Sequence, residues 1–310
     1  MIKSVPGRSC PLHYRYPPSA FGGRATVKAD SLYIVGGLYG NAFALDAVLD
    51  LARQEKAALV FNGDFNWFDI DSAGFEKINE TVLRHTALRG NVETELSPVE
   101  PGIGCGCAYP EWVGEAEVGR SNQIMEMLRQ TASTFPRLCT RLSALPAHLI
   151  AEVGEAKIGI VHGDAESLSG WSFSQERLRD DVGSARALIS ACAVDVFASS
   201  HTCLPVLQNI PGARKSVLIV NNGAAGMPNF EGTNFGIATR IAVTASQRAL
   251  YGGRVGGTYV EAVPIRYDHK EWLAQFDRMW PENSPASLSY RKRILSGPTY
   301  HIADAARLHD

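Results

Sequence analysis

The segment 59–64 constrains the fold of this chain more than any other, because an apolar run ends there in Asn-Gly-Asp. A short apolar run of this kind is typical of a buried strand, which places Asp64 at the strand's carboxyl end. Gly63 permits the sharp backbone turn that leaves the carboxylate exposed. Ligands of open α/β sheets bind beyond the carboxyl ends of the strands. The segment therefore predicts an α/β fold with a ligand site at Asp64.

Three further apolar runs end in side chains that bind metals, namely Asn91, His162 and His201. Together with Asp64 they offer one carboxylate, one amide and two imidazoles. Such a donor set suits a hard or borderline divalent cation such as Mn, Zn or Fe. We therefore expect these four side chains to meet at one metal site.

Composition excludes several classes of protein. With 45% hydrophobic and 20% charged residues the chain has the composition of an ordinary globular protein. The net charge of -2 gives no overall attraction to nucleic acid. No apolar stretch approaches the roughly 18 residues that a membrane span needs, and the N-terminus lacks a signal pattern. We therefore expect a cytoplasmic protein.

The order of the elements indicates two sheets. A strand at 32–35, a helix from Asn41 to Arg53 and a strand at 58–62 form a βαβ unit. Further helices are predicted at 72–86, 118–134 and 174–192, and further strands at 87–89, 145–153, 157–161, 194–198, 204–208, 216–221, 236–245 and 257–266. This order predicts a four-layer α/β/β/α sandwich of two mixed β-sheets flanked by helices.

We expect residues 1–310 to form a single domain, with an N-terminal arm (1–30) and a C-terminal extension (267–310) packed on it. The basic run 291–293 is more typical of a solvated face than of a phosphate site. The stretch 92–117 is predicted to be a loop, because it holds several Pro and Gly residues. Its Cys105 and Cys107 are a poor zinc signal, since structural zinc sites usually use pairs with wider spacing.

Over roughly residues 32–245 the chain resembles the calcineurin-like metallophosphoesterase superfamily, in its small phosphodiesterase-like branch. Four of the five motifs of that family occur in order, as Gly63-Asp64, Gly90-Asn91-Val92-Glu93, His162-Gly163-Asp164 and Ser200-His201-Thr202-Cys203. The Asn221–Ala224 turn resembles the Asn-Pro-Gly-Ser turn of the same branch. The first motif survives only in outline, around Gly40-Asn41.

The resemblance implies a site reduced to one metal. Members of the family bind two metals bridged by the Gly-Asp carboxylate. The positions specific to the first metal are here occupied by Gly37, Tyr39 and Cys203, whereas the ligands of the second are all retained as Asp64, Asn91, His162 and His201. Whether Cys203 binds a metal stays open, because a thiolate suits zinc while a buried thiol is also a common apolar filler.

Weaker candidates surround these ligands. Val92 stands where many phosphatases of the family carry a histidine as general acid. Glu93 keeps the acidic position, with Arg89 or a backbone amide as its expected partner. Arg89 can assist phosphate binding, although a surface ion pair is more typical. Asp164 can hydrogen-bond a histidine ligand, as carboxylates near metals often do.

Aromatic residues lie beside the motifs. Phe65, Trp67 and Phe68 follow Asp64, and such rings can stack on a nucleobase, although packing in the core or at a rim is more typical. Trp171 and Phe173 are expected at the rim of the site.

Three functional hypotheses follow. The first is a metallophosphoesterase with one Mn, Zn or Fe per chain that cleaves a phosphodiester or a small phosphorylated metabolite. The second is a catalytically impaired protein that binds a phosphorylated ligand or a protein partner. The third uses Cys105, Cys107 and Cys203 in a thiolate or redox site, in which case Cys203→Ser would lower the metal content.

Overall fold

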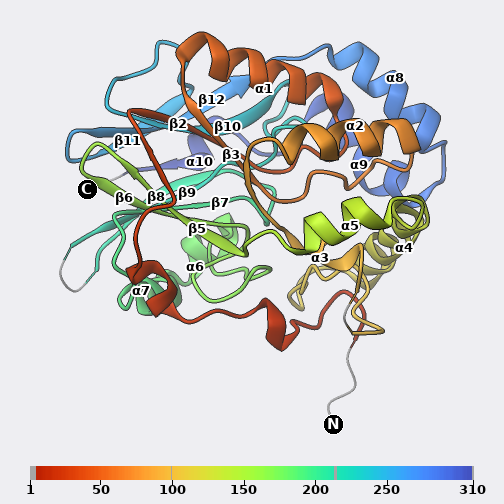
Figure 1. Ribbon diagram of the computed structural model, residues 1–310, viewed down its shortest axis with the longest axis horizontal. Helices are drawn as coiled ribbons and strands as arrows, with labels where there is room; N and C mark the ends of the chain where they lie inside the picture. Colours follow the sequence, from red (N-terminus) through yellow and green to blue (C-terminus); the bar gives the residue numbers. More distant parts are fainter. Residues whose placement is uncertain (1–4, 99, 213–214, 309–310) are drawn as a thin grey trace.

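Two β-sheets lie face to face in the computed structural model, and helices cover their outer faces (Figure 1). The structure describes residues 5–98, 100–212 and 215–308. Apolar side chains from both sheets form the core between them, including Ile34, Val60, Ile158 and Val220. The predicted four-layer sandwich of two mixed sheets flanked by helices is therefore confirmed.

The first sheet has six strands in the order β11 (Tyr251–Val255), β12 (Thr258–Ile265), β10 (Gly236–Ala242), β2 (Ser31–Val35), β3 (Ala58–Asn62) and β4 (Thr86–Leu88). The strands β2, β3 and β4 are parallel, and β10 and β12 are antiparallel to their neighbours. The helices α1 (Ala42–Glu55) and α2 (Ser72–Val82) connect the parallel strands. Parallel strands need such crossovers, so their carboxyl ends meet at one edge.

The second sheet has seven strands in the order β1 (Val27–Ala29), β5 (His148–Val153), β6 (Ala156–Val161), β7 (Val196–Ser199), β9 (Val217–Asn221), β8 (Val206–Ile210) and β13 (Ala306–Arg307). The strands β6, β7 and β9 are parallel. Apolar residues of α6 (Gln175–Asp180) and α7 (Val182–Ile189) pack beside this sheet.

The remaining α-helices of the described residues are α3 (Asn91–Glu95), α4 (Glu115–Ala132), α5 (Pro136–Ser143), α8 (His269–Met279), α9 (Pro285–Ser296) and α10 (Ile302–Ala305). Two short 3-10 helices, η1 (Leu12–Tyr14) and η2 (Pro18–Gly22), lie near the N-terminus. None of the helices in the described part of the chain is long and apolar enough to cross a bilayer.

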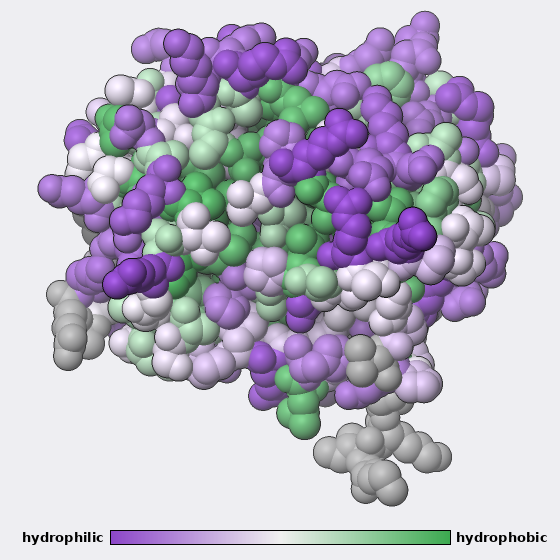
Figure 2. Space-filling view, in the orientation of Figure 1, coloured by the Kyte–Doolittle hydropathy of each residue, from purple (hydrophilic) through white to green (hydrophobic). Residues whose placement is uncertain are grey.

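Helix α1 shows how the pattern of the sequence produces the layer. Its cap Asn41 accepts a hydrogen bond from the backbone N–H of Ala44, which satisfies one of the free donors of the first turn. Apolar residues at helical spacing, among them Leu45 and Val48, are buried. The outward faces of α1 and α8 are largely hydrophilic (Figure 2).

Several elements differ from the sequence prediction. The stretch 92–117 contains most of α3 and the start of α4, and is only partly a loop. The helix predicted at 174–192 is two helices, because Asp181 leaves the helical conformation and caps α7 by accepting from Ser184 N–H. Strand β11 was not predicted, since its sequence Tyr-Gly-Gly-Arg-Val lacks an apolar run.

Both terminal segments contact the central layers. Strand β1 of the arm pairs with β5, and the backbone N–H of Tyr16 donates to the carbonyl of Glu166. In the extension, Trp280 is fully buried and its indole N–H donates to the carbonyl of Phe68 at 2.8 Å. The single-domain organisation of residues 1–310 stays a prediction.

Candidate metal centre

Four polar side chains converge where β3, β4, β6 and β7 end. The Nε2 atom of His162 lies 3.2 Å from Oδ1 of Asp64, from Oδ1 of Asn91 and from Nδ1 of His201. All four side chains are almost fully buried. One ligand atom each from Asp64, His162 and His201 lies within 4.8 Å of the others. We call these four residues the ligand cluster.

The backbone around Asp64 brings the cluster together. Asp64 adopts the left-handed conformation with φ 56°, which costs energy for a residue with a side chain. The Glu93 carboxylate holds this turn by accepting backbone N–H groups of Asp64, Phe65 and Gly90 at 2.8–2.9 Å. Of the two partners expected for Glu93, the structure therefore shows backbone amides.

Two glycines allow the strand ends to approach. Gly63 has φ 78°, and a Cβ there would lie 2.6 Å from both the backbone nitrogen of Gly90 and Nδ1 of His162. A Cβ at Gly90 would meet Oδ1 of Asp64. Neither position has room for a side chain, so the Gly-Asp and Gly-Asn sequences are a steric requirement of the cluster.

The ring of His162 is oriented by the chain beside it. Its Nδ1 faces the carbonyl of Asn62 at 2.9 Å and the hydroxyl of Ser200 at 3.1 Å. The carbonyl can only accept, so Nδ1 carries a hydrogen and Nε2 is directed at the cluster. A backbone carbonyl that fixes the outer nitrogen is typical of histidines that bind metals.

The loop 104–107 orients two more members of the cluster. The carbonyl of Cys107 lies 3.0 Å from Nε2 of His201, so that Nδ1 faces the cluster. The carbonyl of Cys105 accepts from Nδ2 of Asn91 at 2.9 Å, so that Oδ1 faces the cluster. The Cys-x-Cys run points to thiol chemistry, and nothing in the sequence indicates that its backbone carbonyls orient these side chains.

The charges of the cluster are coupled. Burial raises the pKa of Asp64, but His162, His201 and a backbone N–H together outweigh burial and leave that pKa below its ordinary value. Burial lowers the pKa of His162, but the carboxylates of Asp64 and Glu93 and a backbone carbonyl together outweigh burial and leave that pKa raised. Burial and the charge on His162 lower the pKa of His201 to about 4.

These donors fit a divalent cation better than a proton. Three acceptor atoms surround Nε2 of His162, from Asp64, Asn91 and His201. A single proton on Nε2 cannot satisfy three acceptors at 3.2 Å, whereas a cation between the four atoms can contact them all. Carboxylate, amide and imidazole donors suit the borderline divalent ions.

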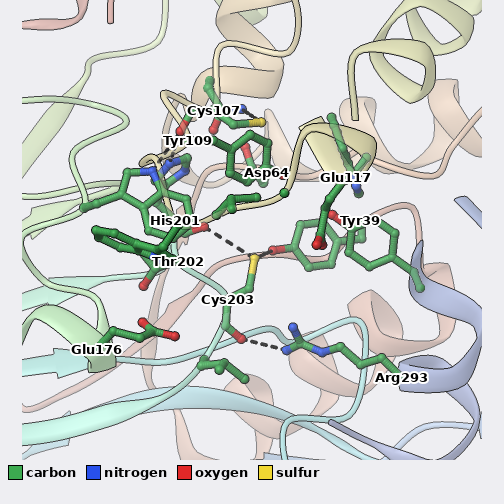
Figure 3. A pocket seen from close by; sticks show the side chains of 18 residues that line it. Tyr39, Asp64, Cys107, Tyr109, Glu117, Glu176, His201, Thr202, Cys203 and Arg293 are labelled. Carbon is green, nitrogen blue, oxygen red and sulfur yellow. Dashed lines mark hydrogen bonds between the residues drawn. The ribbon is translucent and has the colours of Figure 1, made fainter. Parts of the chain in front are cut away.

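The neighbouring region, which consists of Gly37, Tyr39 and Cys203, is arranged differently. We call it the Tyr39 region. The Tyr39 ring covers Gly37 so closely that a Cβ there would lie 2.8 Å from its Cζ. The Tyr39 hydroxyl lies 2.8 Å from Sγ of Cys203 (Figure 3). The ring thus occupies the space that a ligand side chain at position 37 would need.

Two of the weaker candidate residues, Arg89 and Asp164, make their hydrogen bonds away from the ligand cluster. Arg89 forms no ion pair within the described residues, and its guanidinium instead donates to the carbonyls of Ser143 and Leu145. Asp164 does not contact a histidine of the cluster. It accepts backbone N–H groups of the loop that follows, including those of Ser167 and Ser172, and so shapes the loop that carries Trp171.

A cavity of about 330 Å³ opens beside the cluster and is lined by Asp64, Asn91 and His201 (Figure 3). Arg293 of α9 reaches this cavity and donates to the carbonyl of Cys203 at 2.7 Å. The solvated face expected for 291–293 is therefore wrong for Arg293. The sequence showed a basic run but gave no signal for which face of the helix would turn inward.

Aromatic side chains divide between the core and this cavity. Phe65 and Phe68 are fully buried in the core, whereas Trp67 lines the cavity. Trp171 also lines it, and its indole N–H donates to the carbonyl of Cys107 at 2.9 Å. Phe173, expected at the rim, packs in the core of the second sheet instead.

Two solved structures share this architecture. A metallophosphoesterase from Sphaerobacter thermophilus matches with a TM-score of 0.58 and 16% identity, over 87% of this chain and 100% of that chain. A hypothetical protein from Pyrococcus horikoshii matches with a TM-score of 0.56 and 14% identity, over 87% and 99%. No family model and no curated protein matches the sequence.

Identities this low establish a shared fold and leave the reaction open. The order of layers, the strand ends and the positions of the four motifs agree with the resemblance drawn from the sequence. This chain has the calcineurin-like metallophosphoesterase fold.

Proposed function

We propose that this protein is a metal-dependent phosphoesterase that holds one divalent ion between Asp64, Asn91, His162 and His201 and cleaves small phosphodiesters. One observation carries the proposal. The outer polar atoms of His162, His201 and Asn91 face backbone carbonyls, so their remaining nitrogen or oxygen atoms are directed at one point.

A bound divalent ion would supply a Lewis acid that activates water and stabilises charge on the phosphoryl oxygens. The chain offers two further donors beside it. Burial raises the pKa of Tyr39 well above its ordinary value, so its hydroxyl keeps the hydrogen that it can donate to a phosphoryl oxygen. The guanidinium of Arg293 contributes a positive charge at the same cavity.

The charge of the substrate favours diesters over monoesters, and Val92 provides a general acid for neither. It is apolar and fully buried at the position where a general acid is common in this fold. A leaving alkoxide therefore receives no proton from this side chain. A phosphodiester also carries one negative charge instead of two, which suits a site with a single ion.

A second candidate is a protein that binds a phosphorylated ligand without turnover. The packing of Tyr39 on Gly37 favours it, because that packing leaves no room for a ligand side chain at position 37. This candidate predicts that ligand raises the unfolding temperature while no product forms.

The test combines metal analysis with hydrolysis. The purified protein is loaded with Mn, Zn or Fe, and metal per chain and cleavage of bis(p-nitrophenyl) phosphate are measured. We expect one ion per chain and multiple turnover that follows metal content. The substitution Asp64→Asn should abolish both metal binding and turnover. Asparagine tolerates the left-handed backbone at this position. Equal activity in the variant, or a fully loaded protein without turnover, contradicts the proposal.

Other properties stay predictions from the sequence. They are the cytoplasmic location and the absence of nucleic acid among the substrates. The same metal analysis identifies the ion, and light scattering measures the number of chains in the assembly.

A further inference from the structure

The cavity beside the ligand cluster has unusually aromatic walls. Six aromatic side chains from several segments line it, namely Tyr39, Trp67, Tyr109, Trp112, Trp171 and Tyr290. Trp112 is half exposed, so part of this wall faces the opening. Burial of the core does not require an aromatic wall here, and a ligand is the simplest use for it.

The rings around Trp171 meet one another at large angles. Trp171 lies 5.7 Å from Tyr109 at an interplanar angle of 48°, and 6.3 Å from Trp112 at 85°. It also meets the ring of His201 at 80°. A flat nucleobase stacks on parallel ring faces, whereas rings at steep angles surround a compact group. Cages of this kind are used to recognise quaternary ammonium groups.

The charges lining the cavity point to the same ligand. Glu117 and Glu176 line it, and neither carboxylate forms an ion pair or hydrogen bond with another described residue. Figure 3 shows them on opposite sides of the cavity. With a divalent ion bound, the charges of the ion and Arg293 balance those of Asp64, Glu117 and Glu176. A net neutral ligand therefore fits better than a phosphomonoester dianion.

The chain itself shows that one of these rings accepts a cation. The guanidinium of Arg177 lies 4.9 Å from the ring centre of Trp112. Arg177 does not line the cavity beside the cluster.

We propose that the substrate is a zwitterionic phosphodiester, one of whose alcohols carries a choline-like quaternary ammonium group. The phosphoryl group lies at the ligand cluster and Arg293, and the ammonium group lies among the aromatic rings between Glu117 and Glu176. This inference rests on the proposed phosphodiester hydrolysis.

A matched pair of esters tests it. The metal-loaded protein is given p-nitrophenyl phosphocholine and p-nitrophenyl 3,3-dimethylbutyl phosphate, which has the same shape without the positive charge. We expect kcat/KM to be at least about tenfold higher for the choline ester, because a desolvated cation on aromatic rings gains that much. Glu117→Gln and Glu176→Gln should each lower the ratio of kcat/KM for the choline ester to kcat/KM for the uncharged ester. Glu111→Gln, beside Trp112 but outside the cavity lining, should leave it as it is.

A binding measurement separates this inference from the proposed function. Choline and 3,3-dimethylbutan-1-ol are titrated separately into the metal-loaded protein, with tryptophan fluorescence as the readout. Saturable binding of choline alone supports the inference even where no ester is cleaved, in which case the proposed hydrolysis fails by itself. Equal kcat/KM for both esters without choline binding overturns the inference and leaves diester hydrolysis standing. Preferential cleavage of thymidine 5′-p-nitrophenyl phosphate also overturns it, in favour of nucleotides.

Discussion

The ligand cluster and the Tyr39 region are neighbours, yet they are held in opposite ways. In the ligand cluster, backbone carbonyls orient the side chains of His162, His201 and Asn91. In the Tyr39 region, one side chain packs on a glycine and contacts a thiol. In the ligand cluster the ligand atoms stay available to bind an ion. In the Tyr39 region the polar atoms contact each other.

This difference supports the proposal that an ion binds at the ligand cluster and not at the Tyr39 region. Orientation of a ligand by a second partner is common in metal sites and has no purpose in a filled core. Tyr39 and Cys203 both adopt left-handed backbone, with φ 54° and 62°. The chain thus keeps strained turns at both places, but directs ligand atoms to a common point at only one.

The largest expected effect separates the two regions directly. His162→Gln removes the nitrogen at the centre of the ligand cluster, so we expect metal affinity to fall by more than the roughly 10–100-fold that loss of an outer partner costs. Cys203→Ser should leave metal per chain unchanged. Elemental analysis after dialysis measures both. A drop in metal content for Cys203→Ser would instead support the thiolate site.

Acid should weaken metal binding through His162. Its raised pKa means that a proton competes with the ion, so affinity should fall about tenfold for each pH unit below that pKa and level off above it. Competition titrations against a metal indicator measure this. A flat profile would show that His162 is not a ligand.

The metal-free protein should show a different pH trend. The raised pKa of His162 gives stability that is complete below its unfolded value of about 6.5 and is lost as pH rises through the folded value. The lowered pKa of Asp64 gives stability that is present above about 3.9 and is lost as pH falls through the folded value. We therefore expect Asp64 and His162 together to stabilise the metal-free protein only at pH values between their two folded pKa values. Denaturant unfolding in the presence of a chelator, repeated across pH, measures this contribution to the free energy of unfolding.

Glu93→Gln tests the turn beneath the ligand cluster. The carboxylate accepts three backbone N–H groups, and an amide would direct its own N–H at one of these donors. We expect the free energy of unfolding to fall by about 1–3 kcal/mol, with metal affinity falling as the turn loosens. Thr94→Ser, whose hydroxyl can still donate to the Gly90 carbonyl, is the matched control. Equal stability of Glu93→Gln and the control would contradict this role.

The sequence predicted the strand ends well because each was an apolar run followed by a polar residue. Asp64, Asn91, His162 and His201 could each be placed at the end of a strand from the local pattern alone, with two of these strands in one sheet and two in the other. Local pattern contains that information, since the carboxyl ends of parallel strands meet at one edge.

The supporting contacts could not be predicted in the same way. The carbonyl of Cys107 reaches His201 across 94 positions of the chain, and Arg293 reaches Cys203 across 90. A backbone carbonyl has no signature in the amino-acid sequence, and the direction of Arg293 depends on how α9 is packed. The residues that bind were therefore visible, and those that orient and enclose them were not.

The smallest effect is expected in the Tyr39 region. Tyr39→Phe keeps the ring that covers Gly37 and removes the hydroxyl that lies 2.8 Å from Cys203 Sγ. Because a single hydrogen bond contributes about 1 kcal/mol, the free energy of unfolding should change by no more than that and metal per chain should stay the same. Diester hydrolysis should fall by about tenfold, since one neutral donor to the phosphoryl group is lost. A variant that loses its ion would show that the Tyr39 region holds a ligand, and the two neighbouring regions would then form one site.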